Sequence, residues 1–462
     1  MELIKRIKNF SPVGRRRDVD MTEGSILPHL IKFAIPLLIG NIFQQLYNMV
    51  DTWVVGNFVS NEAFAAVGSV GPIINMLIGF FLGLSSGAGV VISQFYGAKR
   101  YDKVHDTVHT AIVMTLVMAV LFTILGIVIT PFLLRFMSTP EDVFPESRAY
   151  LTIYFAGVIG LMVYNIGAGI LRAVGDSKRP FYFLVVSACI NTVLDLFFVL
   201  VLNLGVAGVA YATIIAQCTS AILVVITLLR TDSCIKLTIK DLKPNFEMLG
   251  KIVRVGIPAA LQMAVTSFSN IFVQSYINYF GPDCMSGWTA YAKIDQILFL
   301  PMQSLALAST TFVGQNLGVN NVGRAKTGIR YAFLIAVVFT VLLMIPVIIF
   351  APYLVSFFNA DAGVIEFGTL FLKYITPFYV LCCFNQIYAG ALRGSGDTTA
   401  PMIIMLLSFV GFRQIYLFIM ANYISNTVIA IAMGYPAGWF VASASTFIYY
   451  KLAKFGRKRI VS

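Results

Sequence analysis

The chain has 462 residues, of which 58% are hydrophobic and 12% charged, and its formal net charge is +12. Soluble domains carry about twice that charged fraction, and apolar runs of about 20 residues recur along the whole chain. This composition excludes a soluble domain and predicts an all-α polytopic membrane protein, because a membrane β-barrel would show short alternating segments instead. The basic residues lie between the apolar runs, so the positive net charge does not indicate a nucleic-acid partner.

The first 25 residues are basic and polar. They lack a continuous apolar core followed by a small-residue cleavage site, so we expect no removable signal peptide. Residues 1–10 could form an amphipathic helix on an anionic bilayer surface or a disordered tail, and the sequence leaves both open.

Twelve apolar segments follow, and we expect each to form a transmembrane helix. Several are long and contain Pro or Gly, as tilted or kinked spans do. The expected spans are residues 29–57, 65–95, 107–131, 149–171, 180–203, 206–229, 251–280, 288–317, 328–352, 367–392, 401–422 and 429–450.

The distribution of Lys and Arg predicts the orientation of these spans. If the N-terminus is inside, the inner segments hold 28 of the 33 basic residues, whereas the outer segments hold only Arg135 and Arg148. Because inner loops carry an excess of Lys and Arg, we expect both termini in the cytoplasm. We expect this multi-pass protein to be a monomer.

The chain repeats itself after about 221 residues. Leu171-Arg-Ala-Val-Gly-Asp176 matches Leu392-Arg-Gly-Ser-Gly-Asp397, and Ser93-Gln-Phe-Tyr-Gly97 matches Gly314-Gln-Asn-Leu-Gly318. Each repeat has six spans, so both enter from the same side, as in transporters whose substrate binds between the halves. We expect a cytoplasmic tail (1–28), an N-lobe (29–230), a cytoplasmic linker (231–250), a C-lobe (251–452) and a basic tail (453–462).

Nothing in the sequence indicates a resident cofactor. The six cysteines show neither disulfide nor zinc spacing. His105 and His109 are four residues apart, and we expect them to be solvated rather than metal-bound. The Leu-Arg-x-x-Gly-Asp turns are expected to be structural, since Gly175 and Gly396 suit a helix stop and the following aspartates suit a turn.

Carboxylates inside apolar spans are the main functional signal, because they are costly at membrane depth. Only three of the 21 acidic residues lie well inside spans: Asp51, Asp195 and Asp295. At about 1.5 Å per residue, Asp51, Asp195 and Thr213 all fall about 10 Å from the outer surface. Asn191 lies one turn before Asp195. Spacings of three and four give the first span a polar stripe of Asn41, Gln44, Asn48 and Asp51.

We interpret Asp51, Asn191, Asp195 and Thr213 as an ion-coupling cluster. Their oxygen atoms suit a hard cation such as Na⁺, and two neighbouring carboxyl groups can also bind and release a proton near neutral pH. Either ion would couple a gradient to movement. The alternative is a structural pair of buried groups that interhelical hydrogen bonds satisfy.

The second half lacks a matching pair of carboxylates. After Pro258 the chain offers only uncharged polar residues, including Gln262 and Thr266. Lys293 and Asp295 begin a span near the outside, need not pair, and are as consistent with an interfacial position as with a functional role. Arg413 lies in the outer part of a span, where it could balance cavity charge, but we expect it to snorkel to the surface.

Several motifs together resemble the multidrug and toxic compound extrusion (MATE) family, and its DinF-like branch in particular. They are Asn48-Met-Val-Asp51-Thr-Trp-Val-Val-Gly56, Asn191-Thr-Val-Leu-Asp195, Gly205-Val-Ala-Gly-Val-Ala210 and the paired Leu-Arg-x-x-Gly-Asp turns. The resemblance covers nearly the whole chain, from about Ser25 to Lys454.

The resemblance implies two six-helix lobes around a central cleft that work by alternating access. It implies export of organic, often cationic, compounds in exchange for H⁺ or Na⁺, with no other cofactor. With the short loops, it also implies a multi-pass protein of the cell inner (plasma) membrane. Pro36 matches a proline where the first helix is proposed to bend. The NorM-like branch also uses C-lobe carboxylates, near Thr266 and Cys382 here, which leaves C-lobe coupling open. The implicated residues of the DinF-like branch match Gln44, Asp51, Asn165, Asn191, Asp195 and Thr213, and we expect Gln44, Asn48 and Asn165 to line the substrate cavity.

The sequence is also compatible with functions other than multidrug export. The main alternative is a flippase for a lipid-linked oligosaccharide or other lipid precursor, whose cavity would need cationic side chains. A membrane enzyme lacks support, because the sequence shows no metal-ligand set or nucleophile motif. A channel fits the internal repeat and the kinked spans less well than a gated carrier does.

Overall fold

The computed structural model describes residues 18–59, 61–137, 139–453 and 455–461, and within them the chain is helical, without strands. The expected alternatives for residues 1–10 lie outside this part of the chain. The α-helices are α2 (Ile26–Phe58), α3 (Asn61–Gly97), α4 (Tyr101–Phe136), α5 (Phe144–Ala156), α6 (Val158–Ala173), α7 (Lys178–Leu196), α8 (Gly205–Arg230), α9 (Phe246–Asn278), α10 (Pro282–Gly318), α11 (Val322–Ile349), α12 (Ala351–Ser356), α13 (Ala362–Ile375), α14 (Tyr379–Gly394), α15 (Thr399–Met405), α16 (Arg413–Ile419), α17 (Val428–Ala432) and α18 (Gly434–Leu452).

Short helical segments of other types join some of these helices. The π-helical segments are η1 (Phe197–Val201), η4 (Leu406–Phe412) and η5 (Met420–Ile424), and the 3₁₀ segments are η2 (Ile239–Asp241) and η3 (Thr376–Phe378). Segment η1 continues α7 directly, so the wider π turn begins two residues after Asp195. Such π turns are frequent at functional sites.

The expected count of twelve transmembrane helices is confirmed. In the described part of the chain, eleven helical spans are long and apolar enough to cross a membrane, and the pair α5–α6 makes a twelfth if it is one bent span. That pair covers the segment expected at 149–171 and bends by 47°. The break falls at Gly157, which ends α5 and precedes α6.

The described residues form two compact units. Unit 1 holds Asp18–Asp20 and Ile39–Gly256, and unit 2 holds Met21–Leu38 and Ile257–Val461. The divisions fall inside α2 and α9, next to Pro36 and Pro258. The two units therefore divide the chain inside helices, whereas the expected N-lobe and C-lobe begin and end in loops. The lobe boundaries at 29–230 and 251–452 stay a prediction.

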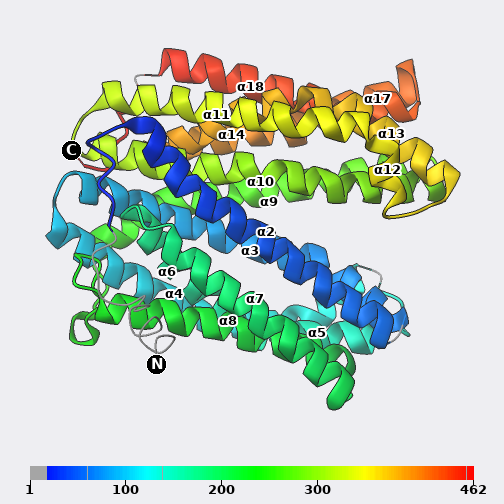
Figure 1. Ribbon diagram of the computed structural model, residues 1–462, viewed down its shortest axis with the longest axis horizontal. Helices are drawn as coiled ribbons and strands as arrows, with labels where there is room; N and C mark the ends of the chain where they lie inside the picture. The colour runs from blue at the N-terminus through cyan, green and yellow to red at the C-terminus, as the bar shows by residue number, and fades with distance from the viewer. Residues whose placement is uncertain (1–17, 60, 138, 454, 462) are drawn as a thin grey trace, which may run out of the picture. The chain divides into compact units, whose positions relative to one another are not determined.

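Unit 1 is built around α6, which packs against α3, α4 and α8, while α7 packs against α8 (Figure 1). Helix α6 is apolar on almost every side and largely buried, as expected for a helix inside a bundle. The first part of α9 also belongs to this unit. There Gly87 of α3 lies so close to Gly256 that an added Cβ would come within 2.5 Å of the Gly256 Cα.

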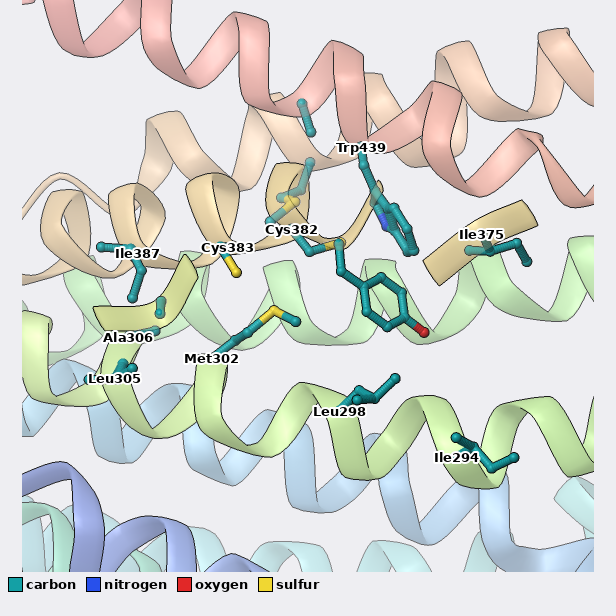
Figure 2. Packing of buried hydrophobic residues seen from close by; sticks show 14 of the residues in the cluster. Ile294, Leu298, Met302, Leu305, Ala306, Ile375, Cys382, Cys383, Ile387 and Trp439 are labelled. Atoms are coloured by element: carbon teal, nitrogen blue, oxygen red, sulfur yellow. The ribbon is translucent and has the colours of Figure 1, made fainter. Parts of the chain in front are cut away.

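Unit 2 is built around α10, which packs against α11, α13 and α14. Figure 2 shows the buried apolar stripe of α10 facing side chains from α13 and α14, with Trp439 of α18 beside them. The α10 spacings of four, four and three keep the stripe on one face. The stripe consists of Ile294, Leu298, Met302 and Leu305.

The repeated Leu-Arg-x-x-Gly-Asp segments are helix stops, as expected. Gly175 and Gly396 have φ values of +85° and +89°, which glycine adopts without the penalty of a side chain. Asp176 forms a buried ion pair of 3.3 Å with Arg179 in unit 1. In unit 2, Asp397 instead pairs with Lys458 of the C-terminal tail at 3.1 Å, because Ala400 stands where the first repeat has Arg179.

One histidine differs from expectation. His109 is 1% exposed rather than solvated, because the segment after α8 covers it. Its Nε2 accepts a hydrogen bond of 2.9 Å from the Thr238 backbone N–H, and its Nδ1 lies 2.8 Å from the His105 carbonyl oxygen. His109 therefore fastens this segment to α4, a structural role that no sequence period reveals.

Candidate functional site

Four helices of unit 1 bring the expected polar residues together. Asp51 comes from α2, Asp195 from the last turn of α7 and Thr213 from α8, and α5 adds Tyr150. Asp51 is 7% exposed and Asp195 is fully buried. Two acidic side chains are thus enclosed in one bundle, where an isolated charge is costly.

The carboxyl groups of Asp51 and Asp195 lie within hydrogen-bonding reach of each other. Among the described residues, both oxygens of Asp195 and Oδ1 of Asp51 have no hydrogen-bond donor. Carboxylates only accept hydrogen bonds, so two ionised groups cannot satisfy one another. They need a proton or another cation between them.

Asn191 adds two further unsatisfied atoms to this part of α7. It is 1% exposed, and neither its amide nitrogen nor its oxygen has a partner among the described residues. It lies one turn before Asp195, on the same face of the helix. Each buried unsatisfied polar group costs about 1–3 kcal/mol of folding free energy. A cluster of such groups therefore needs an explanation, and a site that binds an ion is one.

A tyrosine hydroxyl lies near the carboxyl pair, and a threonine hydroxyl lies beside that tyrosine. Tyr150 lies beside Thr213 and close enough to interact electrostatically with both Asp51 and Asp195. The Thr213 hydroxyl donates to the Val209 carbonyl at 2.9 Å, so its oxygen remains able to accept. These oxygens, with those of the two carboxyl groups, form a donor set that suits Na⁺ as well as a proton.

Sequence reasoning missed the tyrosines of α5. Tyr150 and Tyr154 are buried and stack with ring centroids 6.4 Å apart at an interplanar angle of 14°. The available signal was two tyrosines four residues apart at the start of an apolar span. Their position against Asp51 depends on how α5 packs, which the spacing does not show.

The residues expected to line the substrate cavity are more scattered. Gln44 is half-buried and lies beside Tyr47, whose hydroxyl interacts with Asp51. Asn48 is exposed. Asn165 is buried, its side-chain nitrogen donates to the Leu161 carbonyl at 2.8 Å, and its backbone carbonyl accepts from Ser85 at 2.6 Å. Pro36 lies inside α2, which continues as one helix on both sides of it.

Arg413 of unit 2 overturns an expectation. It was expected to snorkel to the surface, but its side chain is 1% exposed. The guanidinium donates to Ser269 and Asn270 of α9 and lies 4.7 Å from the centre of the Tyr435 ring. These partners come from distant parts of the chain, so the position of Arg413 in its own span did not predict them.

Asp295 and Lys293 of unit 2 also separate. Lys293 is exposed, whereas Asp295 is half-buried. Oδ1 of Asp295 accepts hydrogen bonds from Tyr291, at 3.2 Å, and from Tyr379. The two charged residues therefore do not form a pair, and Asp295 belongs to a network of its own.

Comparison with known proteins gives consistent matches over most of the chain. The MatE family model matches residues 36–197 and 258–419. The probable multidrug resistance protein YpnP of Bacillus subtilis is 28% identical over 435 residues, which cover 94% of this chain and 97% of that protein. A MOP superfamily transporter from Pyrococcus furiosus has a TM-score of 0.89 and 25% identity, covering 94% of this chain and 97% of that one. That protein is described as having a binding pocket of reverse polarity that suggests a different function.

A second solved structure is the outward-facing conformation of a multidrug resistance MATE family transporter of the MOP superfamily. It also has a TM-score of 0.89 and 25% identity, and it covers 94% of this chain and 97% of its own. The two family-model matches are offset by 222 residues. At that offset Val273 and Leu417 stand opposite Asp51 and Asp195, and both are buried and apolar. The carboxyl pair therefore has no counterpart in unit 2.

Proposed function

Since the chain belongs to the MatE family, as its motifs indicated, we propose that it exports organic, often cationic, compounds in exchange for H⁺ or Na⁺. The family consists of transporters, so the chain is a membrane transporter and not an enzyme. Multidrug export is supported by the name of the Bacillus subtilis relative. We further propose a monomer in the plasma membrane with both termini in the cytoplasm, as the distribution of Lys and Arg indicates.

The carboxyl pair of Asp51 and Asp195 is the observation that carries this proposal. Two like charges about 4 Å apart, at an effective dielectric constant of about 20, repel each other by about 4 kcal/mol. A proton or Na⁺ removes this repulsion, so the pair binds one cation readily and resists remaining empty. In our proposal, the empty pair is refilled from the side with the higher ion concentration, and Asn191 and Thr213 contribute further oxygen atoms.

Helix α2 is the element that we propose to transmit ion binding. It carries Asp51 in unit 1, but its residues before Ile39 belong to unit 2. Pro36 lies next to this division and removes one backbone hydrogen bond from the helix. We propose that α2 bends at Pro36 as the pair fills and empties, which shifts the segment carrying Gln44 and Asn48.

The charges of the described residues weigh against an anionic lipid as the substrate. Fold alone does not decide the substrate, because the Pyrococcus furiosus transporter is described as having a pocket of reverse polarity. Here the residues that we propose to line the cavity, Gln44, Asn48 and Asn165, are uncharged, and the cationic side chains needed for a lipid pyrophosphate are poorly available. Lys293 is exposed, and Arg413 is already bonded to Ser269 and Asn270. Nothing in the described residues favours the flippase alternative.

The test is transport by purified protein in liposomes. A fluorescent organic cation, ethidium, is followed under an imposed Na⁺ gradient and then under a pH gradient. We expect one of the two gradients to drive ethidium at least tenfold faster than in protein-free liposomes, which identifies the coupling ion. If folded protein moves no ethidium under either gradient but translocates a fluorescent lipid-linked precursor, the proposal is wrong and the flippase alternative is supported.

A further inference from the structure

The α8–α9 segment, which we define as residues 231–246, is fastened to the first turns of α4. The Thr238 N–H donates to Nε2 of His109 at 2.9 Å, and the Asn245 N–H donates to the Thr110 hydroxyl at 3.0 Å. The segment and the start of α4 both belong to unit 1. Two hydrogen bonds seven residues apart therefore fix the position of the segment along α4.

These hydrogen bonds place the α8–α9 segment at the edge of the hydrocarbon layer. Residues 111–134 of α4 include no charged side chain. At about 1.5 Å per residue this stretch is about 36 Å long, which is enough to cross a hydrocarbon core of about 30 Å. The apolar part of α4 thus begins directly after Thr110. The residues before it lie at the depth of the lipid headgroups, and so does the segment that His109 and Thr110 hold.

Two large apolar side chains of the α8–α9 segment are exposed. Ile239 is 69% exposed and Phe246 is 79% exposed. The neighbouring Ile235 and Leu237 are buried, so the segment packs on the protein through these two and leaves the other two free. Exposed apolar side chains at headgroup depth are typical of segments that lie on a bilayer, because such side chains enter the boundary between headgroups and acyl chains.

Basic side chains accompany these apolar ones. The α8–α9 segment and the last residue of α8 carry four exposed basic residues, Arg230, Lys236, Lys240 and Lys243. No ion pair within the described part of the chain involves any of the four. The segment has two acidic residues, Asp232 and Asp241, and a carboxylate oxygen of Asp241 lies 4.0 Å from Nε2 of His105. The segment therefore presents an excess of positive charge, which attracts anionic lipid headgroups.

We propose that the α8–α9 segment binds anionic phospholipids of the surrounding bilayer, such as phosphatidylglycerol. Ile239 and Phe246 enter the boundary with the acyl chains, and the three lysines contact the lipid phosphates. A soluble anion would match the lysines but leave the apolar side chains in water. A zwitterionic lipid would cover the apolar side chains but give the lysines no net negative charge. An anionic lipid matches both, at the depth that α4 sets. This inference goes beyond the proposed function, because it does not depend on the transported compound.

The test is fluorescence quenching by lipids in liposomes that contain the purified full-length protein. Phe246→Trp places a fluorophore on the α8–α9 segment, and its emission is the difference from the wild type, which has three tryptophans. The bilayers are phosphatidylcholine with a minor share of one brominated lipid, because bromine quenches a tryptophan that it approaches. We expect brominated phosphatidylglycerol to quench the added tryptophan at least twofold more strongly than brominated phosphatidylcholine at the same share.

Two sets of lysine substitutions, each added to Phe246→Trp, show whether the preference belongs to this segment. The segment variant combines Lys236→Gln, Lys240→Gln and Lys243→Gln, and it should lose the preference for phosphatidylglycerol. The matched control removes the same charge from exposed positions on α2, α7 and α11, and it should keep the preference; it combines Lys32→Gln, Lys178→Gln and Lys326→Gln. All six lysines are exposed, so neither set should change the Tm.

Three results would overturn the inference. Equal quenching by the two brominated lipids would show that the segment does not select anionic headgroups. A preference that survives in the segment variant, or disappears equally in the control, would show that these three lysines do not cause it. If neither lipid quenches the added tryptophan, the segment does not contact the bilayer, and a protein partner or a second copy of the chain would have to cover Ile239 and Phe246 instead.

Discussion

The Asp51→Asn variant should fold and insert normally but lose gradient-driven transport by at least 100-fold. The asparagine amide supplies a donor to the unsatisfied oxygens of Asp195 and removes one of two facing charges. The substitution therefore gives the carboxyl oxygens of Asp195 a permanent hydrogen-bond donor, so that the pair no longer needs a bound ion. We expect the same loss in Asp195→Asn, measured as ethidium movement in liposomes under the gradient that drives the wild type.

This variant should also be at least as stable as the wild type. A new hydrogen bond between buried groups contributes about 1 kcal/mol, so the Tm should stay the same or rise by a few degrees. Asp361→Asn is the control, because Asp361 caps α13 by accepting from the Gly363 N–H and Asn caps a helix equally well. An Asp51→Asn protein that unfolds at a much lower Tm, or that still transports at the wild-type rate, would contradict the assignment.

Gly87→Ala should destabilise the protein by about 1–3 kcal/mol, the usual cost of overpacking a close contact. The new Cβ would lie 2.5 Å from the Gly256 Cα and 2.9 Å from the Ile252 carbonyl oxygen. Both are backbone atoms, so no side-chain rotation can relieve the contact, and α3 must move away from α9. Thermal unfolding, followed by tryptophan fluorescence in detergent, measures the loss.

Gly250→Ala is the matched control for that substitution. Gly250 is exposed on α9, and an added Cβ there has no heavy atom within 4 Å. Alanine favours a helix over glycine by about 1 kcal/mol, so this variant should be slightly more stable. If Gly87→Ala were as stable as Gly250→Ala, the first part of α9 would not pack against α3 as the structure shows.

The position of each residue along its helix could be predicted from the sequence, whereas the packing of the helices against one another could not. Hydropathy and the rise per residue predicted the spans, and the equal depths of Asp51, Asp195 and Thr213 suggested one cluster. The same reasoning says nothing about which helix faces which. It therefore missed Tyr150, which α5 brings to the carboxyl pair, and it misplaced Arg413, whose partners come from α9.

The second repeat shows the same limit from another direction. The sequence showed that unit 2 lacks a matching carboxyl pair, but it treated Asp295 only as a neighbour of Lys293. Tyr379 is 84 residues away from Asp295 along the chain, and no period connects them. Such a contact becomes visible only when α10 and α14 are packed together.

We propose that the carboxyl pair of Asp51 and Asp195 in unit 1 exchanges an ion for the substrate. The most direct measurement is the dissociation constant of tetraphenylphosphonium across a series of Na⁺ concentrations and pH values, for the wild type and for Asp51→Asn. If the ion and the substrate oppose each other's binding, then thermodynamic linkage requires that a higher ion concentration raises the dissociation constant of the substrate. We predict at least tenfold weakening by Na⁺ or by H⁺ in the wild type, and loss of that dependence in Asp51→Asn. Substrate affinity that is independent of both ions in the wild type, or equally dependent on the ion in both proteins, would contradict the account.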